Sequence, residues 1–410
     1  MSVLENFEQR ISEAQSNKDC EGIISDICSS TKLHNKDRRE LLEKIISSPK
    51  FEKPSKKLCA EFYTALTEMY NDGVLELIYK FSQKNGYEYS KSLGVCVATN
   101  TWPGRKATEA LIILEKAAAA SSENRNAYFD ILYHVNSVIN EGKDEDNRIA
   151  EQEELICKIL KDVPSGIMLE DEAEIYTDTI KAFSSILNLN NPRHVSLLLE
   201  HLDYAAKNIK HSFEGGDNIS VLCGSILKDG RITPDIEVEF LNVLNTAALN
   251  GNSITGDVFG FTHNEQRLPV YVNEINKIER QLKQKNISSE FCDYALLLAN
   301  EFSADSAVDK NVLLSLVQSA QGSKTSVSRK FISLCIDLAS HDELRDEAVA
   351  VFHKEVPFII KQAANNRDIL GYAYDFYETL PDDYPDEKNI PDILLLAKIT
   401  SNNFCPLLIK

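Results

Sequence analysis

Apolar residues recur along this chain at spacings of three and four, and this pattern constrains the fold more than any other feature. In residues 192–210 the apolar positions share one helical face, because an α-helix turns once every ~3.6 residues. They are Val195, Leu198, Leu199, Leu202, Ala205, Ala206 and Ile209. The spacing returns in residues 58–69, 123–139 and 291–302, and clean period-two alternation over several strands is missing. The sequence therefore predicts an all-α protein.

Capping residues and prolines place the expected helix starts about 20 residues apart. The starts are expected near Pro103, Ser122, Asp144, Glu170, Pro192, Gly216 and Pro234. An antiparallel pair of helices then takes roughly 42 to 47 residues, which overlaps the range of about 40–47 residues for HEAT and armadillo repeats. In helix length and spacing, the chain resembles a HEAT-like α-solenoid over residues 1–250 and 264–400. The resemblance implies a superhelical array of antiparallel helix pairs. It transfers no functional residue, since no residue signature is found from unit to unit.

Burial of the apolar stripes favours a stack of helix pairs. One pair cannot bury its stripe alone, whereas neighbours stacked side by side cover both flanks. Residues 111–114 (Leu-Ile-Ile-Leu) place apolar side chains on more than one face of a helix, so that helix needs partners on two sides. A compact multi-helix domain with the same helix spacing stays an alternative.

Glycine positions indicate where the regular pattern weakens. Seven of the 16 glycines fall in residues 212–270, at positions 215, 216, 224, 230, 251, 256 and 260. We therefore expect an N-terminal helical-repeat domain over residues 1–212 and an irregular connector with short helices over 213–270. A C-terminal helical domain is expected over 271–410.

The charge balance restricts the class of partner. Against 44 Lys and Arg residues stand 63 Asp and Glu residues, a formal net charge of −19. This charge repels the phosphate backbone of nucleic acids and anionic membrane surfaces. It favours a protein partner with a basic face, chiefly through faster encounter. Residues 32–57 depart from the trend with nine basic and four acidic residues, which can pair with the protein's own acidic helices or with an acidic partner segment.

Sequence patterns for metal, cofactor and membrane sites are missing. The nine cysteines form no CxxC pair, the eight histidines form no HExxH motif, and no glycine-rich phosphate loop is found. We expect no metal, no cofactor and buried thiols in a reducing compartment, the cytoplasm. The N-terminal residues read as an amphipathic helix rather than a signal peptide, and the most apolar run is too short to span a bilayer. Secretion as an effector stays open.

Two groups of residues are candidates for partner binding. Trp102 is the single tryptophan of the chain, and Arg105 and Lys106 follow it at an expected helix start, where cations oppose the helix dipole. Trp and Arg are also enriched in binding hot spots. In the glycine-containing stretch 251–271, the candidates are Phe261, His263 and Arg267.

The predicted function is non-enzymatic protein–protein interaction or scaffolding, in which a partner peptide or helix binds to a helical-repeat surface. An enzyme stays an alternative, as a hydrolase or transferase with its site in residues 212–270, around Cys223 and residues 256–267, where Cys223 and His263 are the candidate nucleophile and base. A further alternative is a bacterial effector that binds a host protein.

Overall fold

The computed structural model describes most of the chain as helices joined by short turns. It describes residues 2–69, 73–101, 106–142, 149–161, 163–185, 191–209, 218–227, 232–254, 267–283, 287–322, 328–363 and 368–384. Within these ranges there are nineteen helices and no strand, which confirms the all-α prediction. The chain divides into two compact units, Met1–Ala205 and Ala206–Lys410.

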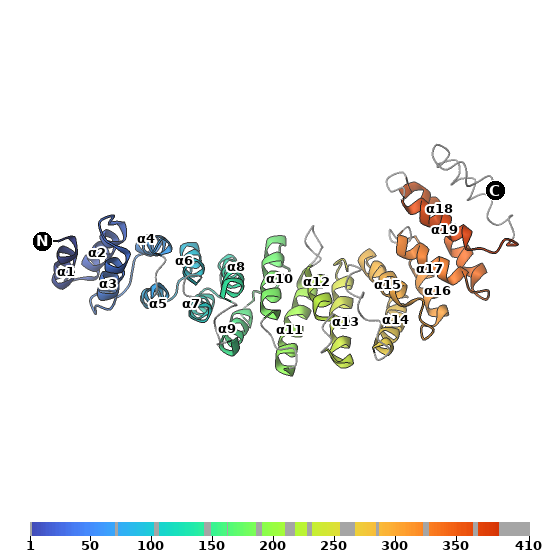
Figure 1. The fold of residues 1–410 in the computed structure, drawn as a ribbon, viewed down its shortest axis with the longest axis horizontal. Coiled ribbons are helices and arrows are strands. Elements are labelled where there is room, and N and C mark those ends of the chain that lie inside the picture. The colour runs from blue at the N-terminus through green and yellow to red at the C-terminus, as the bar shows by residue number, and fades with distance from the viewer. Residues whose placement is uncertain are drawn as a thin grey trace. The chain divides into compact units, whose positions relative to one another are not determined.

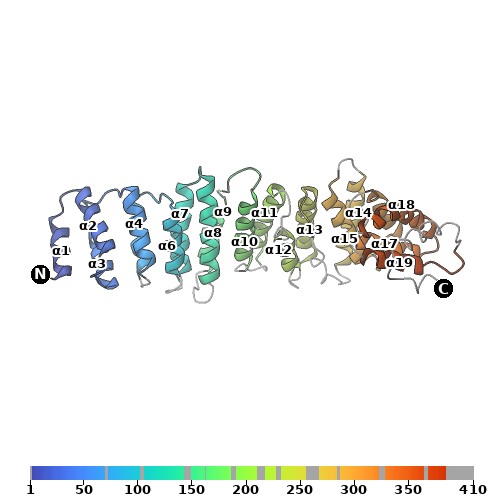
Figure 2. The same cartoon turned by 90° about the horizontal axis from the view of Figure 1, so that it is seen from above.

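Unit 1 is built from helices that pack in two layers (Figure 1). Its helices are α1 (Val3–Glu13), α2 (Asn17–Ser29), α3 (Asn35–Ile46), α4 (Lys56–Thr67), α5 (Val74–Lys84), α6 (Lys91–Thr101), α7 (Ala107–Ala120), α8 (Arg125–Gly142), α9 (Ile149–Lys161), α10 (Glu170–Ser184) and most of α11 (Pro192–Asn208). Helices α2, α4, α6, α8 and α10 pack each against the next, and so do α1, α3, α5, α7 and α9. Figure 2 shows these helices standing side by side.

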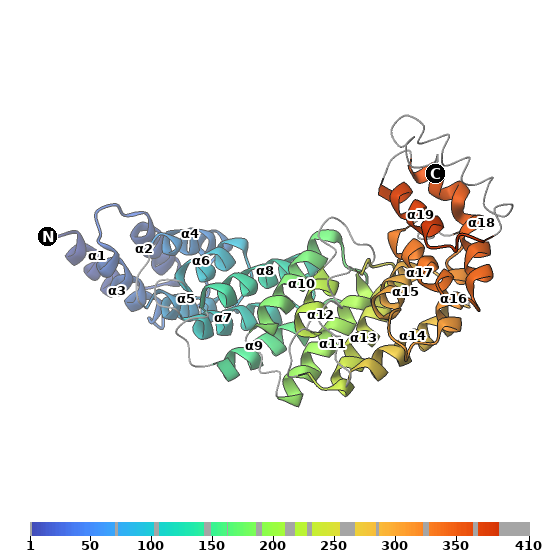
Figure 3. The same ribbon diagram turned by 45° about the vertical axis from the view of Figure 1, so that its right-hand side comes forward.

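Unit 2 repeats this packing of alternate helices. Its helices are α12 (Asn218–Leu227), α13 (Pro234–Leu249), α14 (Leu268–Leu282), α15 (Ser289–Phe302), α16 (Lys310–Ser319), α17 (Arg329–Ala339), α18 (Arg345–Ala363) and α19 (Asp368–Glu378). Helices α13, α15, α17 and α19 pack in succession, and α14, α16 and α18 do the same (Figure 3).

Helix α7 shows why the chain needs this arrangement. The side chains of Leu111, Ile113 and Leu114 are fully buried. They point in different directions around one helix, and α7 accordingly packs against α5, α6, α8 and α9. Aromatic stacking adds to the core between layers, as between Phe62 of α4 and Phe81 of α5, whose ring centroids lie 3.8 Å apart.

One layer of each unit carries a repeated capping residue. The side chains of Ser16, Ser55, Ser288 and Ser328 accept a hydrogen bond from a first-turn backbone N–H of α2, α4, α15 and α17. Ser90 does the same for α6, at 3.3 Å from the nitrogen of Leu93. Such caps satisfy one of the four donors that a helix start leaves open.

Relative to the capping serine, several of these helices carry the same type of residue at the same position. Four residues after the serine come Cys20, Cys59 and Cys292, all of which are buried. Three residues after it come buried Leu or Phe side chains, at positions 58, 93, 291 and 331. The pattern Ser-x-x-Leu/Phe therefore recurs at the starts of α4, α6, α15 and α17, whereas α2 has Asp19 three residues after Ser16.

Three expected helix starts, Glu170, Pro192 and Pro234, coincide with the observed ones. Helix α8 begins at Arg125 rather than near Ser122, because Asn124 caps it with a 3.2 Å bond from the nitrogen of Ala127. Pro103, Asp144 and Gly216 lie outside the described residues. Helices α12 and α13 fall within residues 213–270, and the boundary between the two units falls between Ala205 and Ala206.

Candidate interaction surface

Helices α6, α8 and α10 lie side by side in one layer of unit 1, and among the described residues one flank of each helix carries exposed side chains. Helices α8 and α10 run in the same direction, since Arg125 contacts Glu172 and the Thr179 hydroxyl bonds to the carbonyl of Leu132, at a constant sequence separation. We call their shared exposed flank the outer face. Its exposed and half-exposed residues include Lys91, Val95, Thr99, Asp130, Tyr133, Ser137, Asp171, Glu174, Asp178 and Lys181.

Helices α6 and α8 approach each other closely at Gly94 and His134. A Cβ atom at position 94 would lie 2.2 Å from Cδ2 of His134 and 2.9 Å from the hydroxyl of Tyr89. Only glycine therefore fits this contact without displacement of its neighbours. The imidazole of His134 is buried there, and burial lowers its pKa, which favours the neutral form.

This contact brings two apolar side chains to the same side of the seam. Val95 follows Gly94 on α6, and Tyr133 precedes His134 on α8. Alternate helices of the layer run in parallel, and Gly94 and His134 face each other across the contact. Each residue of an α-helix is rotated by about 100° from the one before it, so the residue after Gly94 and the residue before His134 both point toward the outer face. Val95 is 39% exposed and Tyr133 is 57% exposed. The ring of Tyr133 lies edge-on to that of His134, at 5.4 Å between centroids.

Acidic side chains surround this apolar pair on the outer face. Asp130 lies one turn before Tyr133 on α8, and Asp171, Glu174 and Asp178 follow the free flank of α10 at helical spacing. Lys91 and Lys181 are the basic residues among those named for the face. The outer face thus combines an exposed aromatic ring with an excess of carboxylates, a combination suited to a basic partner segment.

Of Trp102, Arg105 and Lys106, Lys106 is the one that lies among the described residues. Lys106 precedes α7 and is half-buried, and its backbone N–H bonds to the carbonyl of Thr101 at 3.2 Å. Its charge helps to lower the pKa of Glu76, for which the bond to Lys80 is the larger cause. Trp102 and Arg105 lie outside the described residues. Partner binding by this group stays a prediction.

Of Phe261, His263 and Arg267, Arg267 is the one that lies among the described residues. Phe261 and His263 lie outside the described residues. Arg267 is buried and donates to the carbonyls of Leu227, at 3.1 Å, and Ile232, at 3.2 Å. Leu227 ends α12, so the guanidinium satisfies a carbonyl that a helix end leaves open.

A buried carboxylate completes the surroundings of Arg267. Glu237 of α13 lies 3.6 Å from Nε of Arg267 and accepts a hydrogen bond from the hydroxyl of Tyr271. Burial raises the pKa of Glu237, and the bond from Tyr271 and the charge of Arg267 oppose that rise. These contacts connect α12, α13 and α14 and give Arg267 an internal role. Binding of a partner by Arg267 stays a prediction.

Cys223 is fully buried in α12, and burial raises the pKa of its thiol. A nucleophilic cysteine needs the opposite shift, which a nearby cation or helix N-terminus provides. The surroundings of Cys223 therefore keep the thiol protonated and weakly reactive. Its expected partner in the enzyme alternative, His263, is not among the described residues.

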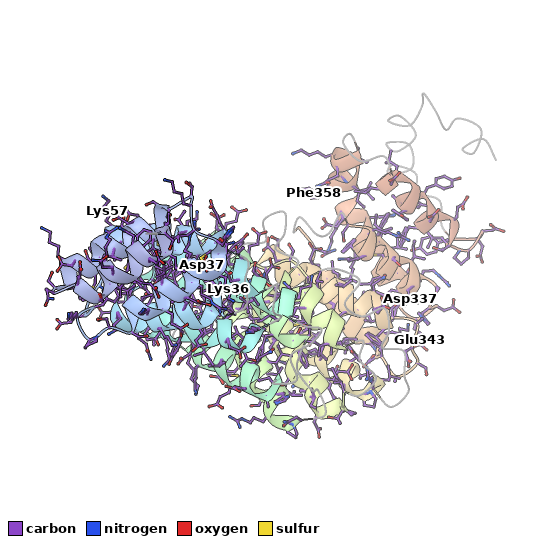
Figure 4. The ribbon with its side chains drawn as sticks, turned by 60° about the vertical axis from the view of Figure 1, so that its left-hand side comes forward. Lys36, Asp37, Lys57, Asp337, Glu343 and Phe358 are labelled. Atoms are coloured by element: carbon purple, nitrogen blue, oxygen red, sulfur yellow. The ribbon has the colours of Figure 1, made fainter. Side chains whose placement is uncertain are left out.

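Several basic side chains of residues 32–57 form ion pairs or hydrogen bonds within the protein. Lys44 pairs with Glu8 at 3.4 Å, and Lys56 pairs with Glu88 at 2.6 Å. The side chain of Lys50 donates to the carbonyl of Ala14. Lys57 lies at the margin of the molecule in Figure 4, with Glu61 at 3.7 Å. These exposed pairs are screened by solvent and contribute little to stability.

The part of the chain that the structure describes was compared with the requirements of a metal site and of a membrane-spanning helix. Within the described ranges, the His, Cys, Asp and Glu side chains form no group of three that could hold a metal ion. Among the described residues, the helices lack the length and apolar character that crossing a membrane requires.

Comparisons with known proteins give little further information. No protein-family model matches the chain, and no curated protein matches it. A solved structure described as an engineered protein aligns with 92% of this chain and 99% of its own, at 12% sequence identity and a TM-score of 0.31. Similarity at this level carries no argument about fold or function.

Sequence reasoning missed Tyr133 and Val95. A signal was present for Tyr133, because the buried stripe of residues 123–139 runs through Tyr128, Leu132 and Val135. Tyr133 does not lie on this buried face, so the helical spacing predicts that its aromatic ring is exposed on the opposite side of the helix. Val95 carried no such signal.

Proposed function

We propose that this protein is a non-enzymatic interaction protein, built as a HEAT-like α-solenoid, whose outer face on α6, α8 and α10 binds a basic segment of a partner protein. The alternate-helix packing in each unit supports the solenoid, because it is a feature of stacked repeats, and the Ser-x-x-Leu/Phe start that α4, α6, α15 and α17 share is consistent with it. The partner binds as an extended peptide or a helix.

The observation that carries the proposal is the exposure of Tyr133 beside Val95. Tyrosine supplies a large apolar area and a hydroxyl with few rotatable bonds, and it is enriched in binding hot spots. The Gly94–His134 contact holds both residues in place, so little ordering is needed on binding.

Small side chains around the apolar pair leave room for a partner backbone. Ala98 and Thr99 lie on α6 beyond Val95, and Ser137 lies one turn beyond Tyr133 on α8. A helix laid across these positions can approach closely, with its own apolar residues against Tyr133. Lysine or arginine residues on its flanks then reach Asp130, Glu174 and Asp178.

The experiment starts with affinity capture by the full chain from a lysate of its source, followed by titration of the purified partner. The double substitution Asp130→Lys/Glu174→Lys reverses charge on the outer face. We expect it to weaken binding by about tenfold and to reduce the dependence of association on salt. The matched control, Glu343→Lys/Glu378→Lys, makes the same charge change in unit 2 and should leave the affinity unchanged.

Two results would contradict the proposal. The first is equal affinity of both charge-reversed variants and the unsubstituted chain. The second is recovery of nucleic acid, bound in a form that survives high salt, in place of a protein.

A further inference from the structure

A loop before α10 displays two large apolar side chains to solvent. The described part of the connection between α9 and α10 is residues 163–169, and in this loop Ile167 is 54% exposed and Leu169 is 69% exposed. Met168, between them, is buried. Gly166 has a φ of 110°, a conformation that favours glycine and turns the chain just before Ile167.

Arg125 holds this loop from the start of α8. Its guanidinium donates to the carbonyls of Ser165, at 3.3 Å, and Ile167, at 3.0 Å. The same guanidinium forms a bidentate pair with Glu172, with N···O distances of 2.6 and 2.5 Å. Planar arginine matches a carboxylate in this way, which fixes direction as well as distance.

Two further bonds fix the ends of the loop. The hydroxyl of Tyr204 donates to the carbonyl of Pro164 at 3.0 Å. The backbone N–H of Leu169 donates to the carboxylate of Glu172 at 2.8 Å, which ties the end of the loop to the first turn of α10. The bond from Arg125 is the main cause that lowers the pKa of Glu172, so this carboxylate stays charged and keeps both bonds.

A loop held so firmly would not need exposed isoleucine and leucine for its own fold. Exposed apolar residues that lie close together often mark a contact site, whereas scattered single ones are normal. Ile167 and Leu169 lie two positions apart in one short segment, and both are exposed. A fixed backbone also removes most of the ordering cost that a flexible loop would have on binding. The fixed loop and the exposed pair together therefore indicate a preformed contact element.

We propose that Ile167 and Leu169 form an apolar anchor that inserts into an apolar pocket on a partner protein, with lysine or arginine residues at the rim of that pocket. We infer a basic rim because Glu170 and Asp171, which are exposed directly after the anchor, would attract positively charged residues of the partner. This inference rests on the proposed function in assuming a protein partner. It concerns a different contact from Tyr133.

The same two acidic residues disfavour a lipid bilayer as the occupant. An apolar loop that enters a membrane surface usually carries basic neighbours, because the headgroups of anionic lipids attract them. Here the neighbours would be repelled. Binding to vesicles is therefore an outcome of the test that contradicts the proposal.

The test places the photo-cross-linking residue p-benzoylphenylalanine at position 167 of the full chain, and at exposed position 221 of α12 as a control, in a lysate of the source. We expect position 167 to cross-link a protein that position 221 does not. The cross-linked protein is then purified and titrated. The variant Ile167→Ser/Leu169→Ser should bind it about tenfold more weakly or worse. The control Val221→Ser/Leu249→Ser, also at exposed apolar positions, should bind as the unsubstituted chain does.

A second variant separates the anchor from the fixed loop. Arg125→Lys keeps the charge and both apolar side chains but loses the bidentate fork, so it should weaken binding by a smaller factor, about threefold. Circular dichroism should show unchanged helix content in all variants.

Three results would overturn the proposal. In the first, Ile167→Ser/Leu169→Ser leaves the affinity for the partner unchanged while Asp130→Lys/Glu174→Lys weakens it. The proposed function would then stand, and the anchor would be wrong. Another is identical cross-linking from positions 167 and 221. The third is flotation with vesicles of phosphatidylcholine and phosphatidylserine (4:1) that the same loop variant abolishes. If neither pair of substitutions changes the affinity, the proposed function fails as well.

Discussion

The backbone of Gly94 lies so close to the imidazole of His134 that a methyl group at position 94 would be 2.2 Å from Cδ2. The two residues belong to neighbouring helices of one layer, α6 and α8. Their contact sets the distance between these helices and brings Val95 and Tyr133 to the outer face.

Gly94→Ala tests this contact. Alanine favours a helix over glycine by about 1 kcal/mol, but here it must displace a buried ring, so we expect a net loss of about 1–3 kcal/mol in unfolding free energy. The control is Gly22→Ala in α2, where an added Cβ meets nothing within 4 Å. That variant should be as stable as the unsubstituted chain or slightly more stable. Urea unfolding followed by circular dichroism measures both, and equal stability of the two variants would contradict the close approach.

Glu172→Gln tests how the loop of residues 163–169 is held. The substitution removes the charge that pairs with Arg125 and weakens the bond to the N–H of Leu169. Since Arg125 is partly exposed, we expect a loss of only about 1–2 kcal/mol. Amide hydrogen exchange at Leu169 should become faster. Glu174→Gln, at an exposed position on the same helix, should leave that exchange rate unchanged; faster exchange in both variants would argue against a specific role for Glu172.

We expect two buried histidines to make the stability of unit 1 depend on pH. Burial lowers the pKa of His134, and also that of His201, whose Nδ1 lies 3.2 Å from the hydroxyl of Tyr176. Below a pH of about 6.5 the unfolded imidazoles take up protons before the folded ones, so stability falls as pH falls from there toward the lower folded values. The unfolding midpoint, measured from about pH 8 to 5, should therefore decrease. The double variant His134→Gln/His201→Gln should show a flatter profile, and an unchanged slope would show that other groups cause the decrease.

Acid should also weaken the loop of residues 163–169. The pKa of Glu172 is lowered in the folded chain, so its contribution is present above a pH of about 4.5 and is lost as pH falls through the folded value. Hydrogen exchange of Leu169, corrected for the intrinsic effect of pH, should accelerate below that range. No acceleration would show that Glu172 does not hold the loop through its charge.

Thiol reactivity tests the enzyme alternative. Burial raises the pKa of Cys157 to about 11, but this side chain is half-exposed, whereas Cys223 is fully buried. In the folded protein Cys157 should therefore react with an alkylating reagent well before Cys223, as mass spectrometry of timed samples can show. Rapid alkylation of Cys223 at neutral pH would instead favour a nucleophilic thiol and an enzyme.

The sequence predicted the helices well because their burial is encoded locally. The stripe through Val195, Leu198 and Leu202 depends only on the helical period, and these side chains are buried as expected. Pro192 and Pro234 mark helix starts for an equally local reason, the fixed φ of proline. The serine caps were harder to recognise as a repeat, since serine is common and the register is visible only once the helix starts are known.

The candidate site was less predictable because it depends on distant contacts. The exposure of Tyr133 depends on which flank of α8 is covered by α6, α7 and α10. The loop that carries Ile167 is fixed by Arg125, about 40 positions earlier in the chain, and nothing in the local sequence indicates that pairing. The residues predicted at Trp102, Arg105, Phe261 and His263 lie outside the described residues and stay predictions.

The most direct measurement of the central claim is the affinity of the captured partner for Tyr133→Ala and for Phe358→Ala. Both substitutions remove an exposed ring, since Tyr133 is 57% and Phe358 is 53% exposed, but Phe358 lies on α18 of unit 2 (Figure 4). If the outer face binds the partner, Tyr133→Ala should weaken binding by about 2 kcal/mol or more, and Phe358→Ala should not change it. An unchanged affinity for Tyr133→Ala would contradict the proposed function.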